Sequence, residues 1–282
     1  MSERISMVNG IHLCWTDFGD ASAPVVVLVA GAASASDWWD DEFCQALASG
    51  GYRVVRYDLR DTGRSTTRPL GQPDYTGDDL VDDLAGLILT LGPNPAHVVG
   101  LSFGGGIAQQ LAIARPALVA SLTLMSTSPG SDGLPPISAG LAAWLARPMP
   151  DTDWNDREAV LRKVLAEEQA FGGDIPVDEA RIRRIAGRVF DRSLDPAAGA
   201  NHWGIPAASG RREQLSDVRA PTLVLHGTRD PLFPIEHGRA LAREIPNARL
   251  LGVPGLGHQF PPPETWDLIV PAILAHLHAH PA

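Results

Sequence analysis

Gly100-Leu101-Ser102-Phe103-Gly104 follows the apolar run Ala96–Val99 and precedes a segment typical of a helix. Glycines two residues to either side of the serine allow a strand and a helix to approach at a sharp turn without Cβ clashes. In such a strand-to-helix turn the serine backbone is strained and its Oγ is exposed as a nucleophile. The same pentapeptide also occurs in ordinary glycine-rich turns, so its interpretation depends on the rest of the chain.

Two later segments carry the partners that a nucleophilic serine requires. Asp230 follows the apolar run 222–227, and His258 lies in the glycine-rich loop after the run Arg249–Val253. A histidine base oriented by a carboxylate activates the serine, and after a turn of this kind the chain order is serine, acid, histidine. Taken alone, Asp230 is typical of a turn before proline and His258 of a surface loop. Their joint placement predicts a catalytic triad of Ser102, Asp230 and His258.

Apolar, β-branched runs alternate with helical segments along most of the chain. This pattern is typical of an α/β fold with a mostly parallel central sheet and helices on both faces. The predicted strands are Val25–Ala30, Tyr52–Tyr57, Ala96–Leu101, Leu122–Met125, Pro221–Leu225 and Arg249–Val253, with an antiparallel edge pair at Arg4–Val8 and His12–Thr16. The predicted helices are Trp38–Ala48, Asp78–Leu91 with Thr76 as its N-cap, Phe103–Ala114, Ile235–Glu244 and Glu264–His278.

Between residues 128 and 212 the pattern changes. Prolines and glycines interrupt its beginning, and two amphipathic stretches, Arg157–Ala170 and Asp178–Arg192, predict helices. The insertion falls between two core strands, above the sheet edge that carries Ser102, so we expect a helical cap that selects the substrate. The predicted organisation is a core of residues 1–127 and 213–282 with a cap of residues 128–212.

Composition limits the partners of the chain. Its 282 residues suit one large α/β domain with an insertion, and the net charge of −10 without a Lys/Arg stripe argues against nucleic acid. Since no run approaches the roughly 20 apolar residues of a membrane span and no signal peptide begins the chain, we expect a cytoplasmic protein. Cys14 and Cys44 are predicted to be reduced packing residues. His276 and His280 lack a further metal ligand nearby, so we expect a solvated tail.

Together, Ser102, Asp230 and His258 resemble the α/β-hydrolase family, over essentially the whole chain outside the cap. More narrowly, the N-terminal half resembles the aclacinomycin methylesterase group of polyketide-tailoring hydrolases. The segments that carry this likeness are Met1–Ile5, Asp17–Asp20, Arg56–Ser65 and Ala96–Ser102, with a carboxylate at Asp61 where most α/β hydrolases have glycine. The resemblance implies an α/β-hydrolase fold and hydrolysis of a methyl ester on an anthracycline-type ring.

The segment Ala30-Gly31-Ala32-Ala33-Ser34 departs from this pattern, because many relatives have a His-Gly or Gly-Gly pair there. The chemistry therefore carries over better than the substrate. The resemblance implies an oxyanion hole from the backbone N–H groups of Ala32 and Phe103, since a backbone donor survives a change of side chain. Asp58, Arg60 and Arg64 are interpreted as an ion network that braces the neighbouring loops.

The sequence therefore predicts a serine esterase that works on a small molecule without a metal or an organic cofactor, as a monomer or homodimer. We expect the substrate to be a methyl ester of an aromatic polyketide-type molecule. Lactone, thioester or C–C bond hydrolysis, a non-hydrolytic cyclisation and a ligand-binding receptor stay open as alternatives. The large flat side chains expected in the substrate pocket are Trp38, Trp144, Trp154 and Trp203.

Overall fold

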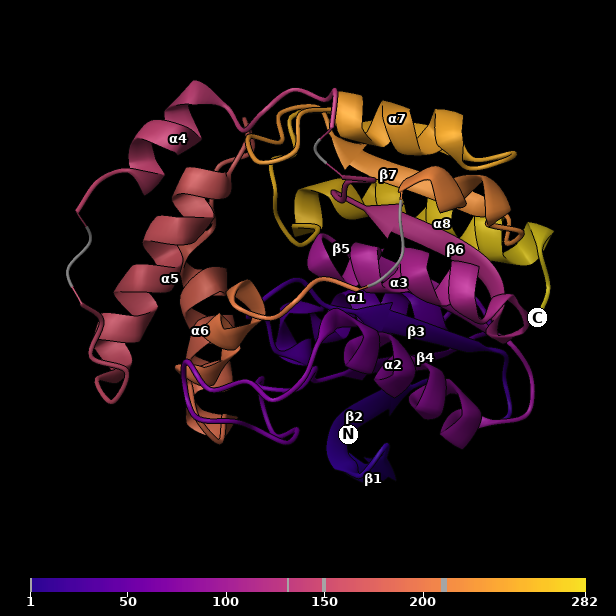
Figure 1. The fold of residues 1–282 in the computed structure, drawn as a ribbon, viewed down its shortest axis with the longest axis horizontal. Helices are drawn as coiled ribbons and strands as arrows, with labels where there is room; N and C mark the ends of the chain where they lie inside the picture. The colour runs from indigo at the N-terminus through magenta and orange to yellow at the C-terminus, as the bar shows by residue number, and fades with distance from the viewer. Residues whose placement is uncertain (1, 131, 149–150, 209–211) are drawn as a thin grey trace.

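The computed structural model describes residues 2–130, 132–148, 151–208 and 212–282. Met1 and, within the predicted cap, residues 131, 149–150 and 209–211 lie outside this part. One eight-stranded sheet runs through the molecule in the order β1-β2-β4-β3-β5-β6-β7-β8 (Figure 1). The edge strand β1 (Arg4–Val8) pairs antiparallel with β2 (Ile11–Phe18), which in turn pairs antiparallel with β4.

The remaining strands are parallel, and their bounds agree with the predicted runs to within a few residues. They are β3 (Val25–Val29), β4 (Arg53–Tyr57), β5 (Ala96–Leu101), β6 (Val119–Met125), β7 (Thr222–Gly227) and β8 (Arg249–Val253). Because parallel strands point the same way, the loops that carry Ser102, Asp230 and His258 all leave the sheet at one edge. The predicted α/β fold with a mostly parallel sheet is confirmed.

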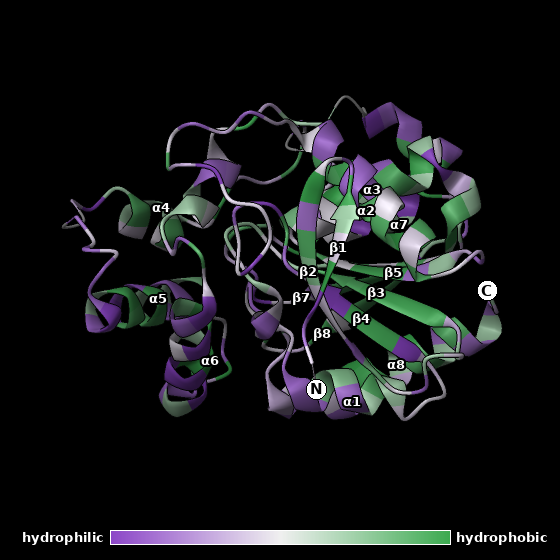
Figure 2. Cartoon of the chain, turned by 90° about the horizontal axis from the view of Figure 1, so that it is seen from below, coloured by the Kyte–Doolittle hydropathy of each residue, from purple (hydrophilic) through white to green (hydrophobic). Residues whose placement is uncertain are grey.

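Helices cover both faces of this sheet and form two hydrophobic cores (Figures 1 and 2). The first layer contains α2 (Gly77–Leu91), α3 (Phe103–Ala114) and α7 (Glu236–Glu244), and the second contains α1 (Asp41–Ala48) and α8 (Trp266–Ala279). Successive strand residues point to opposite faces, so Val27 and Val29 join the first core while Val26 and Leu28 join the second. Uninterrupted β-branched and aliphatic runs are therefore required in the central strands.

Of two helix starts predicted from the sequence, one is confirmed by the structure and the other is wrong. The predicted N-cap of α2 is confirmed, because the Thr76 backbone N–H donates to the Asp79 carboxylate at 2.8 Å in a capping box. The prediction that a helix begins at Trp38 is wrong: Ser36–Trp38 is a short 3-10 helix, η1, and α1 begins at Asp41. Trp38 ends η1 and Trp39 follows it with an extended backbone. Both rings pack against Phe260 in front of α1.

The expectation of a solvated tail is also wrong for His276. Helix α8 continues to Ala279, and the His276 side chain is turned into the sheet, with 1% of the residue exposed. Its Nε2 lies 3.2 Å from the carbonyl oxygen of Leu122 in β6. The inner face of a helix packed on a sheet buries whatever residue the helical period places there.

Cys14 and Cys44 are buried and free, and burial raises the pKa of both thiols to about 12.

We keep the name cap for the predicted insertion, residues 128–212, between β6 and β7. The two helices predicted in it are confirmed as α5 (Arg157–Phe171) and α6 (Glu179–Arg192). The cap also contains α4 (Ala139–Leu145) and the 3-10 helix η3 (Ala198–Trp203), which no sequence pattern predicted; η4 (Arg212–Asp217) packs on α3 and α7 of the core, where η2 (Pro116–Leu118) and η5 (Pro263–Thr265) also lie. In Figure 1, α4, α5 and α6 stand beside the sheet, at the edge where the strands end. Within the described residues, no helix is long and apolar enough to cross a membrane.

Candidate active site

Ser102 lies at the strand-to-helix turn between β5 and α3, in the left-handed region of the backbone with φ 53° and ψ −117°. A non-glycine residue in this region is strained. Two hydrogen bonds hold it there: its N–H donates to Met125 O at 2.8 Å, and its carbonyl accepts from Thr127 Oγ1 at 2.7 Å. A Cβ at Gly104 would stand 2.4 Å from Ala30 O, so this crossing of helix and strand requires glycine.

His258 reaches Ser102 from the loop after β8. Its Nε2 lies 2.9 Å from Ser102 Oγ, and its Nδ1 lies 2.9 Å from Asp230 Oδ2. Since a carboxylate only accepts, Nδ1 carries the proton and Nε2 is free to accept from the serine hydroxyl. The backbone N–H of His258 donates to Phe171 O at the end of α5, at 2.8 Å. The cap therefore helps to place the imidazole.

Asp230 lies on the loop after β7, and its side chain is buried. Its second oxygen, Oδ1, accepts from the backbone N–H groups of Leu232 at 2.9 Å and Phe233 at 2.8 Å. Three donors thus fix the carboxylate in a single orientation toward the histidine. His226 stands beside it, and burial lowers the pKa of this imidazole, which binds Phe233 O through Nε2 at 2.7 Å.

The two predicted oxyanion donors flank Ser102. Ala32 lies in the turn after β3, and a Cβ built at the preceding Gly31 would be 3.7 Å from Ser102 Cβ. Phe103 is the first residue of α3. Within the described part of the chain, neither the Ala32 N–H nor the Phe103 N–H donates to a protein acceptor. Both groups are therefore available to an oxygen on a bound molecule.

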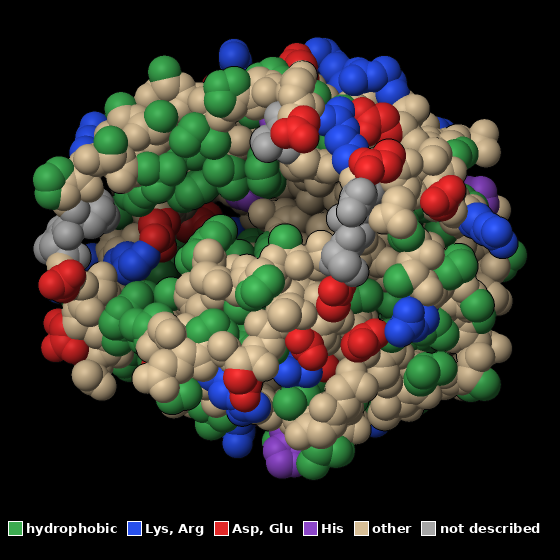
Figure 3. All heavy atoms as spheres, viewed as in Figure 1, with side chains coloured by type: hydrophobic (Ala, Val, Ile, Leu, Met, Phe, Trp, Pro, Cys, Tyr) green, Lys and Arg blue, Asp and Glu red, His purple; other side chains and the backbone are tan. Residues whose placement is uncertain are grey.

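Aromatic side chains surround His258. Phe171 of the cap lies 6.0 Å from the imidazole, between ring centres, and Phe233 lies 5.4 Å from it. Trp144 of α4 packs edge-on against Phe171 at 6.4 Å, so it extends this wall away from the sheet. Figure 3 shows that the molecule is hollowed on the face seen there, with hydrophobic side chains around the hollow and acidic and basic ones within it.

The predicted pocket tryptophans are placed differently from one another. Trp38 is buried and stacks on Phe260, two residues beyond His258. Trp154 lies beneath Lys163 Nζ on α5, and Trp203 ends η3 with 74% of its surface exposed. Among the aromatic contacts of the described residues, only the chain from Trp144 through Phe171 leads from one of these tryptophans to His258. Roles for all four remain predictions.

Sequence reasoning missed two side chains at this site, Phe233 and Glu168. Phe233 was missed because the direction of its ring depends on how the loop after β7 folds, which has no periodic signature. Glu168 of α5 was missed because an isolated carboxylate in an amphipathic helix is typical of a solvated face. Burial raises the pKa of the Glu168 carboxyl to about 7, although Arg181, Gln259 and His258 nearby act in the other direction.

The interpretation of Asp58, Arg60 and Arg64 as an ion network agrees with their contacts. Asp58 is fully buried and binds the cap residue Arg192 at 2.7 Å, Arg60 binds Asp83 at 2.6 Å, and Arg64 binds Glu3 at 2.9 Å. These pairs join the loops after β4 to the N-terminal strand, to α2 and to the cap. None of the three contacts reaches Ser102 or His258.

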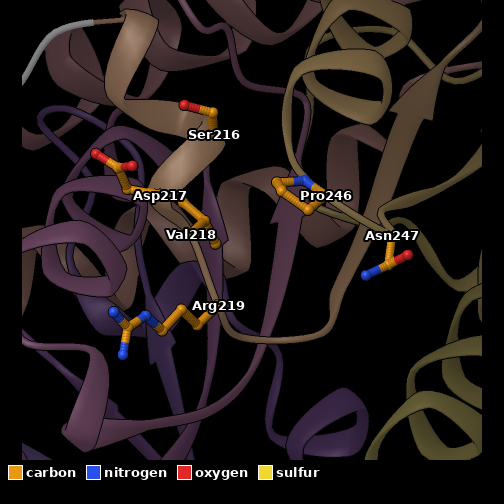
Figure 4. A pocket seen from close by; sticks show the side chains of 6 residues that line it. All are labelled: Ser216, Asp217, Val218, Arg219, Pro246 and Asn247. Carbon is orange, nitrogen blue, oxygen red and sulfur yellow. The ribbon is translucent and has the colours of Figure 1, made fainter.

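A second hollow lies far from these side chains. A shallow surface pocket of about 500 Å³ is lined by Ser216–Arg219, Pro246 and Asn247 (Figure 4). These residues precede β7 and β8, so the pocket opens at the amino-terminal edge of the sheet, opposite the loops that carry Asp230 and His258. In the described residues, no group of three or more His, Cys, Asp or Glu side chains is placed to hold a metal ion.

Comparison with known proteins agrees with the fold. Residues 24–261 match the alpha/beta hydrolase fold family. Rhodomycin D methylesterase of Streptomyces peucetius is 30% identical over 298 residues, with 99% of each chain covered. The enol-lactonase of Burkholderia xenovorans superposes with a TM-score of 0.73 at 25% identity, over 98% of this chain and all of that one.

A meta-cleavage product hydrolase of Pseudomonas fluorescens has the same fold, with a TM-score of 0.73 at 22% identity over 98% of this chain and 97% of that one. The family match spans most of the chain, and the methylesterase likeness spans nearly all of it. This chain is a hydrolase and belongs to the α/β-hydrolase family.

Proposed function

We propose that this hydrolase cleaves a carboxylic ester through an acyl-enzyme on Ser102, with His258 as base and Asp230 as its orienting carboxylate. The observation that carries the proposal is the unbroken chain of two 2.9 Å contacts from Ser102 Oγ through the imidazole to the Asp230 carboxylate. A nucleophile, a base and an orienting group within hydrogen-bond reach are the requirements of this chemistry.

In the first half of the reaction, Ser102 Oγ attacks the acyl carbon and its proton passes to His258 Nε2. The N–H groups of Ala32 and Phe103 stabilise the negative oxygen of the tetrahedral intermediate. The intermediate collapses when Nε2 returns the proton to the leaving alkoxide, which departs as the alcohol. In the second half, water attacks the acyl-enzyme, again gives its proton to Nε2, and the acid leaves as Ser102 recovers its proton.

We further propose that the ester is a methyl ester of an aromatic polyketide-type molecule. The 30% identity to a rhodomycin D methylesterase supports this class, and so does the aromatic wall of Trp144, Phe171 and Phe233 beside His258. Flat apolar rings gain from stacking against such side chains. Lactone hydrolysis is the second candidate, because the same chemistry opens a cyclic ester and an enol-lactonase shares the fold at 25% identity.

A panel of polycyclic aromatic methyl esters and lactones, followed by mass spectrometry in H₂¹⁸O, tests the proposal. We expect a methyl ester to yield methanol and an acid that carries one ¹⁸O atom, and Ser102→Ala to abolish this turnover. Ser121→Ala is the matched control. Ser121 Oγ also contacts a histidine, His97 Nδ1 at 2.8 Å, but this pair lies near the amino-terminal ends of β5 and β6, away from Ser102. Turnover of lactones alone would favour the second candidate, and turnover of neither class would refute the proposed substrates.

A further inference from the structure

A hydrogen bond that the proposed function does not use joins the cap to the turn that carries Ala32. His202 lies in η3, and 169 residues separate it from Ala33. The Ala33 N–H donates to His202 Nδ1 at 3.0 Å, and His202 Nε2 lies 2.8 Å from the carbonyl oxygen of Arg60. A carbonyl oxygen only accepts, so Nε2 carries the proton and Nδ1 presents the lone pair that Ala33 requires.

The same imidazole also touches the second predicted oxyanion donor. Its ring stacks on Phe103, with centres 5.2 Å apart and planes 24° from parallel. One buried cap side chain therefore contacts both segments, Ala32–Ala33 and Phe103, whose N–H groups flank Ser102. Burial lowers the pKa of His202, which keeps the ring in the neutral form that both hydrogen bonds require.

The turn at Ala33 has a reason to need support. Ala33 has a φ of 56°, in the left-handed region that a residue with a Cβ rarely adopts. Its neighbour in the cap, Gly199, packs so closely that an added Cβ would stand 3.1 Å from Ala33 Cα. A strained turn persists only where the surrounding structure determines it.

Hydrogen bonds to the Asp61 carboxylate hold η3 in place. Its carboxylate accepts from Asn201 Nδ2 at 2.9 Å and from the Tyr75 hydroxyl at 2.6 Å. Asn201 Oδ1 in turn accepts from the Gly71 N–H at 2.7 Å. Asp61 has a φ of 65°, a backbone conformation that glycine would adopt without strain. The aspartate at this position therefore contributes through its carboxylate and not through its backbone. The carboxylate that distinguishes the sequence thus anchors the residue next to His202.

We propose that His202 is a positioning residue for the oxyanion hole: through its hydrogen bond to Ala33 and its stacking on Phe103, the cap fixes the two N–H donors around Ser102. The inference rests on the proposed function, because it assigns a role within acyl transfer. It goes beyond that function by making the cap part of the catalytic geometry and not only a cover that selects the substrate.

Three substitutions of His202 each keep one of its three contacts and remove the others, so the effect of each contact can be measured. His202→Asn keeps an acceptor at the place of Nδ1 for the Ala33 N–H, and His202→Gln keeps a donor at the place of Nε2 for Arg60 O. His202→Phe keeps only the ring on Phe103. Loss of one oxyanion donor costs about 10²–10³ in kcat and a misplaced donor somewhat less, so we expect about 10- to 100-fold lower kcat in His202→Gln and His202→Phe.

His202→Asn is expected to retain kcat within about 5-fold of the native enzyme, since a kept hydrogen bond preserves most of the donor geometry. KM for p-nitrophenyl acetate should stay nearly constant in all three variants, because this small ester leaves the cap surface unfilled. The rate of Ser102 modification by a fluorophosphonate should fall in parallel with kcat, since its phosphoryl oxygen occupies the same hole. His97→Phe is the matched control. It removes a buried, hydrogen-bonded imidazole near the amino-terminal end of β5, away from Ser102.

Equal kcat in His202→Asn and His202→Gln, or native kcat in His202→Phe, would overturn the positioning role. So would a loss in His97→Phe equal to that in His202→Phe, because general destabilisation would then explain both. Ser102→Ala is measured alongside: if it keeps its turnover, the proposed function fails and this inference fails with it. If Ser102→Ala is inactive while His202→Phe is unimpaired, only this inference fails.

Discussion

At the scale of single residues, the site depends on backbone positions that tolerate no substitution. Gly100, Gly104 and Gly105 lie where helix α3 crosses the sheet, and an added Cβ at each would stand within 2.6 Å of another atom. Ser102 and Ala33 both adopt positive φ in the turns that face each other across the site. The strain at these turns therefore lies in the segments proposed to carry the nucleophile and the oxyanion donors.

Gly104→Ala is expected to lower both the melting temperature and kcat, because its Cβ would meet the backbone oxygens of Ala30 and Val29 at 2.4 and 2.5 Å. Gly106→Ala in the same helix is the control, since a Cβ there meets nothing within 4 Å. Alanine is the better helix former by about 0.5–1 kcal/mol, so this control should be neutral or stabilising. Equal effects of the two substitutions in thermal unfolding would show that the close crossing is not what requires glycine.

The sequence predicted the placement of Ser102, Asp230 and His258 because each follows a recognisable strand, and parallel strands bring such loops to one edge. It did not predict the contact of Ala33 with His202. That contact joins a turn to a 3-10 helix 169 residues away, and neither segment has a period that indicates a partner. Local patterns place residues on elements, whereas contacts between distant loops depend on the packing of those elements.

At the scale of elements, the cap is attached to the core by arginines of α6. Arg192 binds Asp58 at 2.7 Å and Asp37 at 2.7 Å, and Arg188 binds Asp37 at 2.7 Å. Arg181 binds the buried Asp40. Helices α5 and α6 were predicted from their amphipathic periods, but η3 and α4 are too short for a period to appear. The partners of the arginines were not predictable, since charged residues in a helix are usually solvated.

Arg192→Met is expected to destabilise the protein by about 3–5 kcal/mol, because it leaves the fully buried carboxylate of Asp58 without its cation. Arg157→Met is the matched control in the cap: its pair with Asp191 is exposed, and such pairs contribute about 0–1 kcal/mol. Urea unfolding measures both. Asp58 also accepts from the Ser36 and Arg64 N–H groups, so the double change pairs Arg192→Met with Asp58→Asn, which removes the charge and keeps one acceptor oxygen. It should recover part of the loss, and a loss as large as that of the single change would contradict an electrostatic cause.

Trp144→Ala is expected to reduce kcat/KM for a polycyclic aromatic methyl ester about 5- to 150-fold, the effect of losing 1–3 kcal/mol of ring contact. Hydrolysis of p-nitrophenyl acetate should change little, because this ester does not reach the aromatic wall beyond Phe171. Trp203→Ala is the comparison, since 74% of Trp203 is exposed. The ratio of the two rates in each variant decides: equal losses on both esters would mean that Trp144 only holds the cap together.

At the scale of the whole molecule, buried histidines tie stability to pH. Burial lowers the pKa of His97 and of His276 to about 4, with neighbouring histidines adding to the effect. The unfolded chain binds protons on these groups near pH 6.5, whereas the folded chain does so only near pH 4. Stability is therefore full above about pH 6.5 and is lost as the pH falls toward 4. The sequence did not indicate this, because it predicted His276 in a solvated tail.

Between pH 7.5 and pH 5 we expect each of these histidines to reduce the free energy of unfolding by about 2 kcal/mol. His97→Phe should remove part of that dependence, while substitution of the exposed His12 by Gln should leave it unchanged. Urea unfolding at the two pH values measures the difference. An identical pH dependence in native protein and in His97→Phe would show that the His97 site does not contribute.

The central claim is that this chain acts through a covalent intermediate on Ser102. Intact-protein mass spectrometry after acid quenching of p-nitrophenyl acetate turnover tests it most directly, with peptide mapping to locate the adduct. The account predicts one acetyl group on Ser102, no adduct in Ser102→Ala, and turnover reduced by about 10⁶ in Ser102→Ala and in His258→Ala. An adduct on another residue, or unchanged turnover without Ser102, would contradict it.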